Sequence, residues 1–276
     1  MWARSKKKHP SCTGFLDLPR ELRDIIYENA LCVSGAIFIY SSDPDNIRHC
    51  VRAKVVREKT KGPQEPQSIG STISIALMRT CRQLHVESSE ILYGRNLFRM
   101  YMVNVGFGPV YLPFVRHITF TTDADHRIYG DDLDTVSYWW RRRFWPNIVD
   151  KSQRLLERYP KLETLNFPIN SNQFGRTWRP AFLASELKTR EQRVSLAATW
   201  MRSHSPFESD RLQKCLHLEI VPSGLDTPKA STGEESIESR VARIKARVAE
   251  LTGNFLPEED WDCTEFAEAF ERMKLL

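Results

Sequence analysis

The feature that most restricts the fold is an order of elements that occurs twice: an apolar pattern of helix length, followed by one of strand length. The two copies lie at 147–167 and 181–221. Successive strands that are joined through a helix run parallel in one sheet, and the crossover between them is right-handed. The sequence therefore predicts a mixed α+β fold in which helix–strand units build the body.

The spacing of apolar residues, together with prolines and glycines, predicts the remaining elements. Pro19 suits the first position of a helix, and Gly35 ends that helix. Further helices are expected at 73–93, 131–159 with an interruption at Pro146, 181–203, 237–251 and 262–274. Strands are expected at 36–40, 51–56, 97–105, 115–121, 162–167 and 212–221.

These elements predict the division of the chain. We expect disorder at 1–14, a first domain at 15–120 that contains inserted strands and a loop at 57–72, and an α/β body at 121–221 that is continuous with it. A linker at 222–234 precedes C-terminal helices at 235–276, which are expected to dock on the body. The segment YPKLETLNF at 159–167 resembles one turn of a leucine-rich repeat, although no fixed repeat length is present.

Composition favours a soluble, intracellular globular protein. Hydrophobic residues make up 41% of the 276 residues, which is enough for a core. No apolar run has the length of a membrane span or follows the basic N-terminus as a secretory signal would, so we expect a cytoplasmic or nuclear location, or both. The net charge of +5 is mild, and acids alternate with bases, which disfavours a dedicated nucleic-acid binder. Cys32 and Cys81 are expected to be small buried hydrophobes.

The sequence predicts no enzyme, no cofactor and no metal site. Nucleotide-binding glycine motifs, the nucleophile elbow and zinc-binding histidine motifs are all missing from the sequence. His85 and His217 are more simply explained as structural or surface histidines than as ligands. The acids at 123–134 precede a predicted helix, where they suit capping and the helix dipole.

The most unusual stretch is the aromatic and basic run at 138–145. Its aromatic residues are expected to hold a helix to the body while the arginines face solvent, because neighbouring residues on a helix point about 100° apart. A second protein-interaction patch and a nucleic-acid contact surface remain open as alternatives. The residues of this possible patch are Trp139, Trp140, Arg141, Arg142 and Arg143.

Two segments together carry a family resemblance. FLDLPRELRDIIYENAL at 15–31 resembles the opening helix of an F-box, commonly LPxEL followed by an apolar pair. LMRTCRQLHVESSEILYGRNLF at 77–98 narrows the resemblance to a large group of mostly fungal F-box-like proteins close to the two-EXR domain. The resemblance covers roughly residues 15–120.

The resemblance implies a non-catalytic adaptor that joins a substrate protein to a cullin–RING ubiquitin ligase through a Skp1-like subunit. The implied docking residues are Leu18, Pro19, Leu22, Ile25 and Ile26. An F-box packs its helices within some forty residues, whereas here about forty residues that include apparent strands separate the two segments. The alternative is that the stripe of the first helix packs against the helix at 73–93, inside a stand-alone protein-interaction domain. In that stripe Leu22, Ile25 and Ile26 are aligned, and Arg20, Arg23 and Asp24 lie off it.

Overall fold

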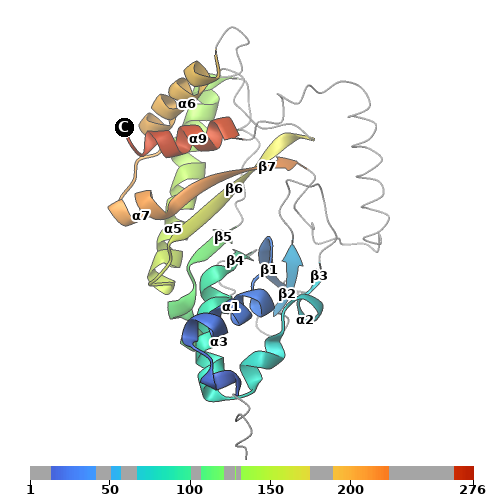
Figure 1. Cartoon of the computed structure of the whole chain (residues 1–276). Helices are drawn as coiled ribbons and strands as arrows, with labels where there is room; N and C mark the ends of the chain where they lie inside the picture. Colours follow the sequence, from blue (N-terminus) through green and yellow to red (C-terminus); the bar gives the residue numbers. More distant parts are fainter. Residues whose placement is uncertain are drawn as a thin grey trace, which may run out of the picture.

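A computed structural model describes residues 14–41, 51–56, 67–100, 107–120, 128, 132–174, 189–223 and 264–276. The fold is the predicted mixture of helices and strands, arranged around one sheet (Figure 1). Among the described residues, the sheet has seven strands in the order β3-β2-β1-β4-β5-β6-β7. Their bounds are β1 Ala36–Ser41, β2 Val51–Val56, β3 Gln67–Ser68, β4 Leu97–Met100, β5 His117–Phe120, β6 Thr164–Phe174 and β7 Leu216–Ser223.

The strands from β1 onward follow a simple rule. β1 pairs antiparallel with β2, and β2 pairs antiparallel with β3. On the other side of β1, the strands β4, β5, β6 and β7 are added one after another, each parallel to the strand before it. Parallel sheets of the nucleotide-binding type bind ligands at a crevice where the strand order reverses. In this sheet the strand order reverses between the parallel strands β1 and β4, because β2 and β3 lie on one side of β1 and β4 to β7 follow on the other.

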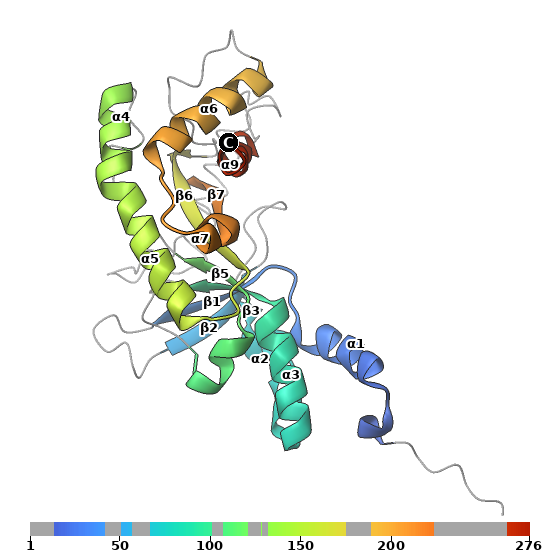
Figure 2. The ribbon, with the colours of Figure 1, turned by 90° about the vertical axis from the view of Figure 1, so that its left-hand side faces the viewer.

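Helical segments connect and cover the strands. The helices are α1 Arg20–Leu31, α2 Ile69–Thr72, α3 Arg82–Arg95, α4 Leu133–Trp139, α5 Trp145–Arg158, α6 Arg190–His204, α7 Asp210–Cys215 and α9 Thr264–Met273. Shorter turns are η1 Phe15–Asp17, η3 Ile75–Arg79, η4 Pro109–Phe114 and the π-helical η6 Trp140–Phe144. Right-handed crossovers that always advance toward the same edge place their helices on one face. Figures 1 and 2 show α5, α6 and α9 together on that face.

The core lies between the helices and this face of the sheet. Matching positions of adjacent strands supply a buried row, consisting of Ile37, Phe98, Ile118, Leu165 and Leu216. Farther along β6, Phe167 contacts Trp145 of α5 and Phe270 of α9, with ring centres 6.3 Å and 5.3 Å apart. The predicted inward positions Phe266, Phe270 and Met273 of the last helix are all buried.

The opposite face of the sheet carries most of the polar side chains of the strands, together with the aromatic rings of Phe38 and Tyr40 on β1. Arg99 of β4 donates to a carboxylate oxygen of Glu219 on β7 over 2.6 Å, although β5 and β6 lie between these strands. The connections between the strands are unequal in their described parts: η4 lies between β4 and β5, whereas α6 and α7 lie between β6 and β7. Unequal connections agree with the missing repeat length.

Pro146 does not interrupt its helix, contrary to the sequence-based expectation. The backbone stays helical from α4 through the π turn η6 into α5. Pro146 lies in the first turn of α5, where a proline is tolerated because the ring fits helical geometry and few bonds are lost. The π turn immediately before it absorbs the change in hydrogen bonding.

Three other boundaries differ from the prediction. The expected helix at 73–93 is split, because η3 occupies 75–79 and α3 begins only at Arg82. Cys81 is therefore an exposed N-cap, whose sulfur accepts from the Leu84 N–H over 3.5 Å, and not a buried hydrophobe; Cys32 is half-buried. The first residues of the expected strand at 212–221 are helical instead, because they belong to α7, and the strand β7 begins only at Leu216. The Ser209 hydroxyl caps α7 by accepting from the Leu212 N–H over 3.2 Å.

Several predictions lie wholly or partly outside the described residues. These are the disordered N-terminus up to residue 13, most of the loop at 57–72, the strand beyond 100, the start of the helix at 181–203, the linker beyond 223 and the apolar stripe at 237–251. Within the loop, the structure places β3 and α2 at 67–72.

Candidate protein-docking surface

Helix α1 has two sides with different roles. Arg23, Tyr27 and Leu31 repeat every fourth residue, so they share one side of the helix. All three are buried, and this side packs against α3. The expectation that the Leu22–Ile26 stripe packs against this helix is therefore wrong, because α1 contacts α3 through a different side that includes an arginine.

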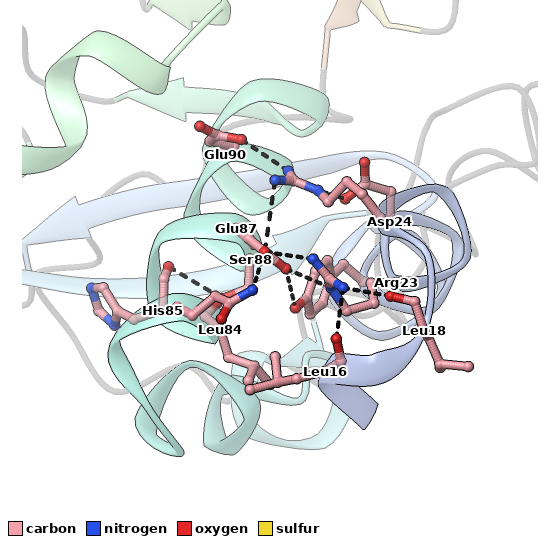
Figure 3. A network of polar contacts seen from close by, with 12 residues as sticks. Leu16, Leu18, Arg23, Asp24, Leu84, His85, Glu87, Ser88 and Glu90 are labelled. Atoms are coloured by element: carbon pink, nitrogen blue, oxygen red, sulfur yellow. Dashed lines mark hydrogen bonds and ion pairs between the residues drawn. The ribbon is translucent and has the colours of Figure 1, made fainter. Parts of the chain in front are cut away.

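A buried polar network fastens α1 to α3 (Figure 3). Arg23 donates through Nε and Nη2 to the two oxygens of the Glu87 carboxylate, over 2.9 Å and 2.8 Å. The Tyr27 hydroxyl donates to the same carboxylate over 2.9 Å, and the Gln83 amide donates over 3.0 Å. The bidentate geometry and the two extra donors compensate for burying the charges.

The same arginine also fixes the turn before the helix. Its Nη1 donates to the carbonyl oxygens of Leu16 over 3.2 Å and of Leu18 over 2.5 Å (Figure 3). At the other end of α1, Asn96 donates to the Leu31 carbonyl over 3.0 Å and accepts from the Val33 N–H over 2.9 Å. Both ends of α1 are therefore held in place by side chains that follow it by sixty residues or more in the chain.

The electrostatics of this network follow from its contacts. The hydrogen bonds from Arg23, opposed by burial and supported by Gln83 and Tyr27, lower the pKa of Glu87 to about 2. Burial, followed by the hydrogen bond to Glu87, raises the pKa of Tyr27 to about 12. At the rim, the hydrogen bond to Asp24 raises the pKa of Arg20, which also contacts Glu90 over 2.9 Å. Glu87 is thus a carboxylate at neutral pH.

The outer side of α1 is apolar and exposed. Leu22, Ile25 and Ile26 have exposed fractions of 48%, 54% and 40%. Ile25 follows Arg23 by two residues, or about 200° around the helix, so it points almost directly away from α3. Of the other implied docking residues, Pro19 is exposed and Leu18 is half-buried. The structure brings this set together at the start and along the outside of one helix.

The side chains of the aromatic and basic run at 138–145 point in different directions around the helix, so some are buried and others are exposed. Trp140 is fully buried: its Nε1 donates to the Ser205 hydroxyl over 2.7 Å, and its ring contacts Trp200 and Phe266. Trp140 therefore belongs to the core and cannot take part in a surface patch. Trp139 is half-buried, and the arginines at 141–143 are exposed.

The surface beside these arginines carries both signs of charge. Arg141 borders an open depression of about 240 Å³, which Trp145, Pro146 and Val149 line together with Asp150 and Glu208. Acidic side chains in the depression repel phosphate groups, and the buried Trp140 cannot stack on a base. The packing interpretation therefore describes this run better than a nucleic-acid surface does.

The other residues that the sequence singles out have structural partners. His85 contacts the Met78 carbonyl over 2.9 Å and the Tyr111 hydroxyl over 3.1 Å, and so links α3 to η3 and η4. His217 pairs with Glu271 of α9 over 2.8 Å. Asp132 caps α4 through the Thr135 N–H over 2.8 Å, as predicted. In the described part of the chain, no cluster of histidine, cysteine and acidic side chains could hold a metal ion.

Sequence reasoning missed Arg23 and Glu87 as the residues that position α1. A charged residue that lies off an apolar stripe is normally assigned to solvent, and a glutamate on a separate helix gives no hint of its partner. The signal was the spacing Arg23–Tyr27–Leu31, which marks a second side of the helix at intervals of four.

Comparisons with known proteins give one match. Residues 7–125 are similar to a family described as a domain of unknown function, DUF7730. The matched segment includes α1, α3 and the Arg23–Glu87 network. No curated protein and no solved structure matches the chain. In the residues that the structure describes, no helix combines the length and apolar character of a membrane span.

Proposed function

We propose that this chain is a non-catalytic interaction protein, an F-box-like adaptor that recruits a substrate protein to a cullin–RING ubiquitin ligase by docking α1 on a Skp1-like subunit. The observation that carries the proposal is the apolar outer side of α1, formed by Leu22, Ile25 and Ile26. The LPRELRDIIY segment supplies these residues, and its resemblance to an F-box helix supplies the identity of the partner.

The rigidity of α1 supports a docking role. A helix that binds as a separate, flexible element loses conformational freedom on association, and that loss weakens binding. Here Arg23 holds the preceding turn and α3, and Asn96 holds the following turn. The outer side chains are therefore presented in a fixed arrangement before any partner arrives.

The three side chains can account for a measurable share of an affinity. Burying a whole aliphatic side chain contributes about 1.5–3 kcal/mol, and about half of each is still exposed, so docking contributes roughly 1 kcal/mol per residue. Removing two of them should weaken binding by about tenfold to a hundredfold. Introducing charges at these positions should weaken it further, because the charges would be buried.

The test is binding of purified Skp1 to the full chain, measured by pull-down and by titration. We expect binding by the unmodified protein and its loss in the variant that carries Leu22→Asp and Ile26→Asp. Leu196→Asp on α6 is the matched control, because Leu196 is an equally exposed leucine on a distant helix. If the unmodified chain does not bind, or if the double variant still folds and binds as well as the unmodified chain, the proposal is wrong.

A stand-alone interaction domain without a link to ubiquitin ligases is the second candidate. It is favoured by the insertion of β1, β2 and β3 between α1 and α3, which departs from a compact F-box. A photo-crosslinking residue in place of Ile25 separates the two candidates in cells. Crosslinking to a Skp1-like protein supports the adaptor, whereas reproducible crosslinking to a different protein at the same position supports the second candidate.

A further inference from the structure

Among the described residues, the outer edge of β2 is paired over only part of its length. β3 is two residues long, and it pairs with β2 at Lys54 and Val55 alone. The preceding residues Val51–Ala53 pair with β1 on their inner side, and no described residue pairs with them on the outer side. An uncovered strand edge exposes N–H and C=O groups that an extended peptide can complete.

Two cations lie on the polar face beside this edge. Arg52 and Lys54 alternate along β2, so they point to the same side of the sheet. Arg52 is exposed, and no described carboxylate pairs with either residue. Among the described strand residues, the acid on this face is Glu219, which Arg99 binds over 2.6 Å. The patch therefore keeps a local positive charge next to a strand edge that can accept a partner.

Aromatic rings position one of these cations. The rings of Phe38 and Tyr40 on β1 are stacked, with centres 5.5 Å apart and planes 10° from parallel. The Lys54 ammonium lies 4.9 Å from the centre of the Tyr40 ring. This contact restrains the lysine side chain on the face of the sheet, where no carboxylate of the described residues pairs with its ammonium.

The same contacts favour a peptide over a nucleic acid. Single strands of nucleic acid bind sheet surfaces mainly by stacking bases on bare aromatic rings. The Tyr40 ring is already in contact with Phe38 and Lys54. An incoming strand of polypeptide needs no such ring, because it bonds to the main chain of Val51–Ala53 and places alternate side chains beside Arg52 and Lys54.

We propose that the outer edge of β2 binds an extended acidic segment of a partner protein by strand addition, with its carboxylates paired to Arg52 and Lys54. This surface does not include the apolar side of α1, so the inference does not depend on the adaptor proposal. It assigns a second partner to the chain, of a chemistry that α1 does not recognise.

Fluorescence anisotropy with the full chain tests the proposal. The probe is a labelled peptide of alternating threonine and glutamate, about ten residues long, which favours extended structure and places its acids on one side. The same peptide with lysine in place of glutamate, and a labelled single-stranded oligouridylate, are the comparison probes. We expect the acidic peptide to bind most tightly, and its binding to weaken as salt is added.

Charge reversal locates the site. Arg52→Glu combined with Lys54→Glu is expected to weaken binding of the acidic peptide by about tenfold or more. Arg142→Glu reverses the charge of an exposed arginine of η6 and should leave the affinity for the peptide unchanged. Arg52→Gln with Lys54→Gln is a milder variant that keeps the fold if the reversal does not. Hydrogen exchange should slow at Val51–Ala53 when the peptide binds, as strand addition requires.

Three outcomes would overturn the inference. One is tighter binding of the lysine peptide or of the oligouridylate than of the acidic peptide. Another is equal binding of the acidic peptide to the unmodified chain and to a folded variant at positions 52 and 54. The third is peptide binding without any slowing of exchange at Val51–Ala53.

Discussion

Replacing Glu87 by glutamine tests whether the buried network, and not apolar packing alone, holds α1 on α3. Glutamine has nearly the same volume, so the change removes the charge without creating a cavity. It also converts one acceptor oxygen into an NH₂ donor, which then faces a nitrogen of Arg23 or the hydroxyl of Tyr27. At least one donor therefore loses its acceptor in a buried place.

The expected loss of unfolding free energy follows from the burial of Glu87 and from the geometry of its hydrogen bonds. Removing one partner of a fully buried ion pair costs about 3–5 kcal/mol, and a single hydrogen bond to a charged group contributes about 1.5–3 kcal/mol. The side chain of Glu87 is 9% exposed, and glutamine retains one acceptor, so we expect a loss at the lower end, about 2 kcal/mol of unfolding free energy. For a chain of this size that corresponds to roughly 5 °C in melting temperature.

The pH dependence supplies a second, independent signature. The pKa of Glu87 is about 2 in the folded protein, below its value of about 4.3 in an unfolded chain. A depressed folded pKa stabilises the protein above the unfolded pKa, and this stabilisation disappears as the pH falls from about 4.3 toward 2. Glutamine does not titrate. The difference in stability between the two proteins should therefore be largest near neutral pH and shrink below about pH 4.

The assay is thermal and urea unfolding of both proteins, followed by circular dichroism at several pH values. Glu90→Gln is the control, because Glu90 lies on the same helix and pairs with Arg20 over 2.9 Å at the exposed rim. An exposed pair contributes about 0–1 kcal/mol, so this control should change stability little. Two results would refute this explanation. One is equal unfolding free energies for Glu87→Gln and Glu90→Gln at neutral pH. The other is a stability difference between Glu87→Gln and the unmodified protein that stays the same as the pH is lowered below about 4.

Three further predictions concern other parts of the molecule. Leu22→Asp with Ile26→Asp should leave the protein folded and lower its unfolding free energy by about 1–2 kcal/mol, because about half of each side chain is already exposed; urea titration followed by circular dichroism checks this. Trp140→Phe should reduce the unfolding free energy by about 2–3 kcal/mol in urea titrations, because it removes the bond to Ser205 and leaves a gap in the core. Pro146→Ala should leave stability within about 1 kcal/mol of the original in the same titrations, because the helix already passes through this position.

The succession of elements could be predicted from sequence because it depends on local patterns. Alternation of apolar residues and the positions of prolines and glycines identify β1, β5, α6 and α9, and the helix–strand order leads to parallel pairing. The order of the strands in the sheet could not be fixed from the sequence, because apolar patterns do not say on which side of its neighbour each strand is added. What these patterns do not contain is how many residues at each boundary join the neighbouring element.

The errors in the prediction have identifiable physical causes. Leu212 and Leu216 fit strand alternation, yet Ser209 starts a short helix by capping it, and capping depends on one side chain rather than on a period. Pro146 has opposite effects in the interior and in the first turn of a helix, and its position depended on a π turn that gives no apolar signal. The burial of Arg23 required Glu87, which lies 64 residues away.

The candidate docking residues were identified from a motif, but their exposure was not. Leu22, Ile25 and Ile26 form an apolar stripe, and such a stripe faces the core in most helices. The opposite side of α1 is the one that faces α3: Tyr27 and Leu31 are fully buried there beside the ion pair of Arg23 with Glu87. Deciding between two sides of one helix requires knowledge of the partner helix, which a single sequence does not provide.

The progressive strand order has a consequence for how such a chain can diversify. Because each parallel strand is laid down beside the previous one, α1 with α3 and α6 with α9 occupy separate ends of the molecule (Figure 2). Substitutions at well-separated sites combine additively. Substitutions on the surface of α6 or at the end of β7 should therefore not alter the conformation of α1. One end of the molecule can change its surface during evolution while the other end keeps its structure.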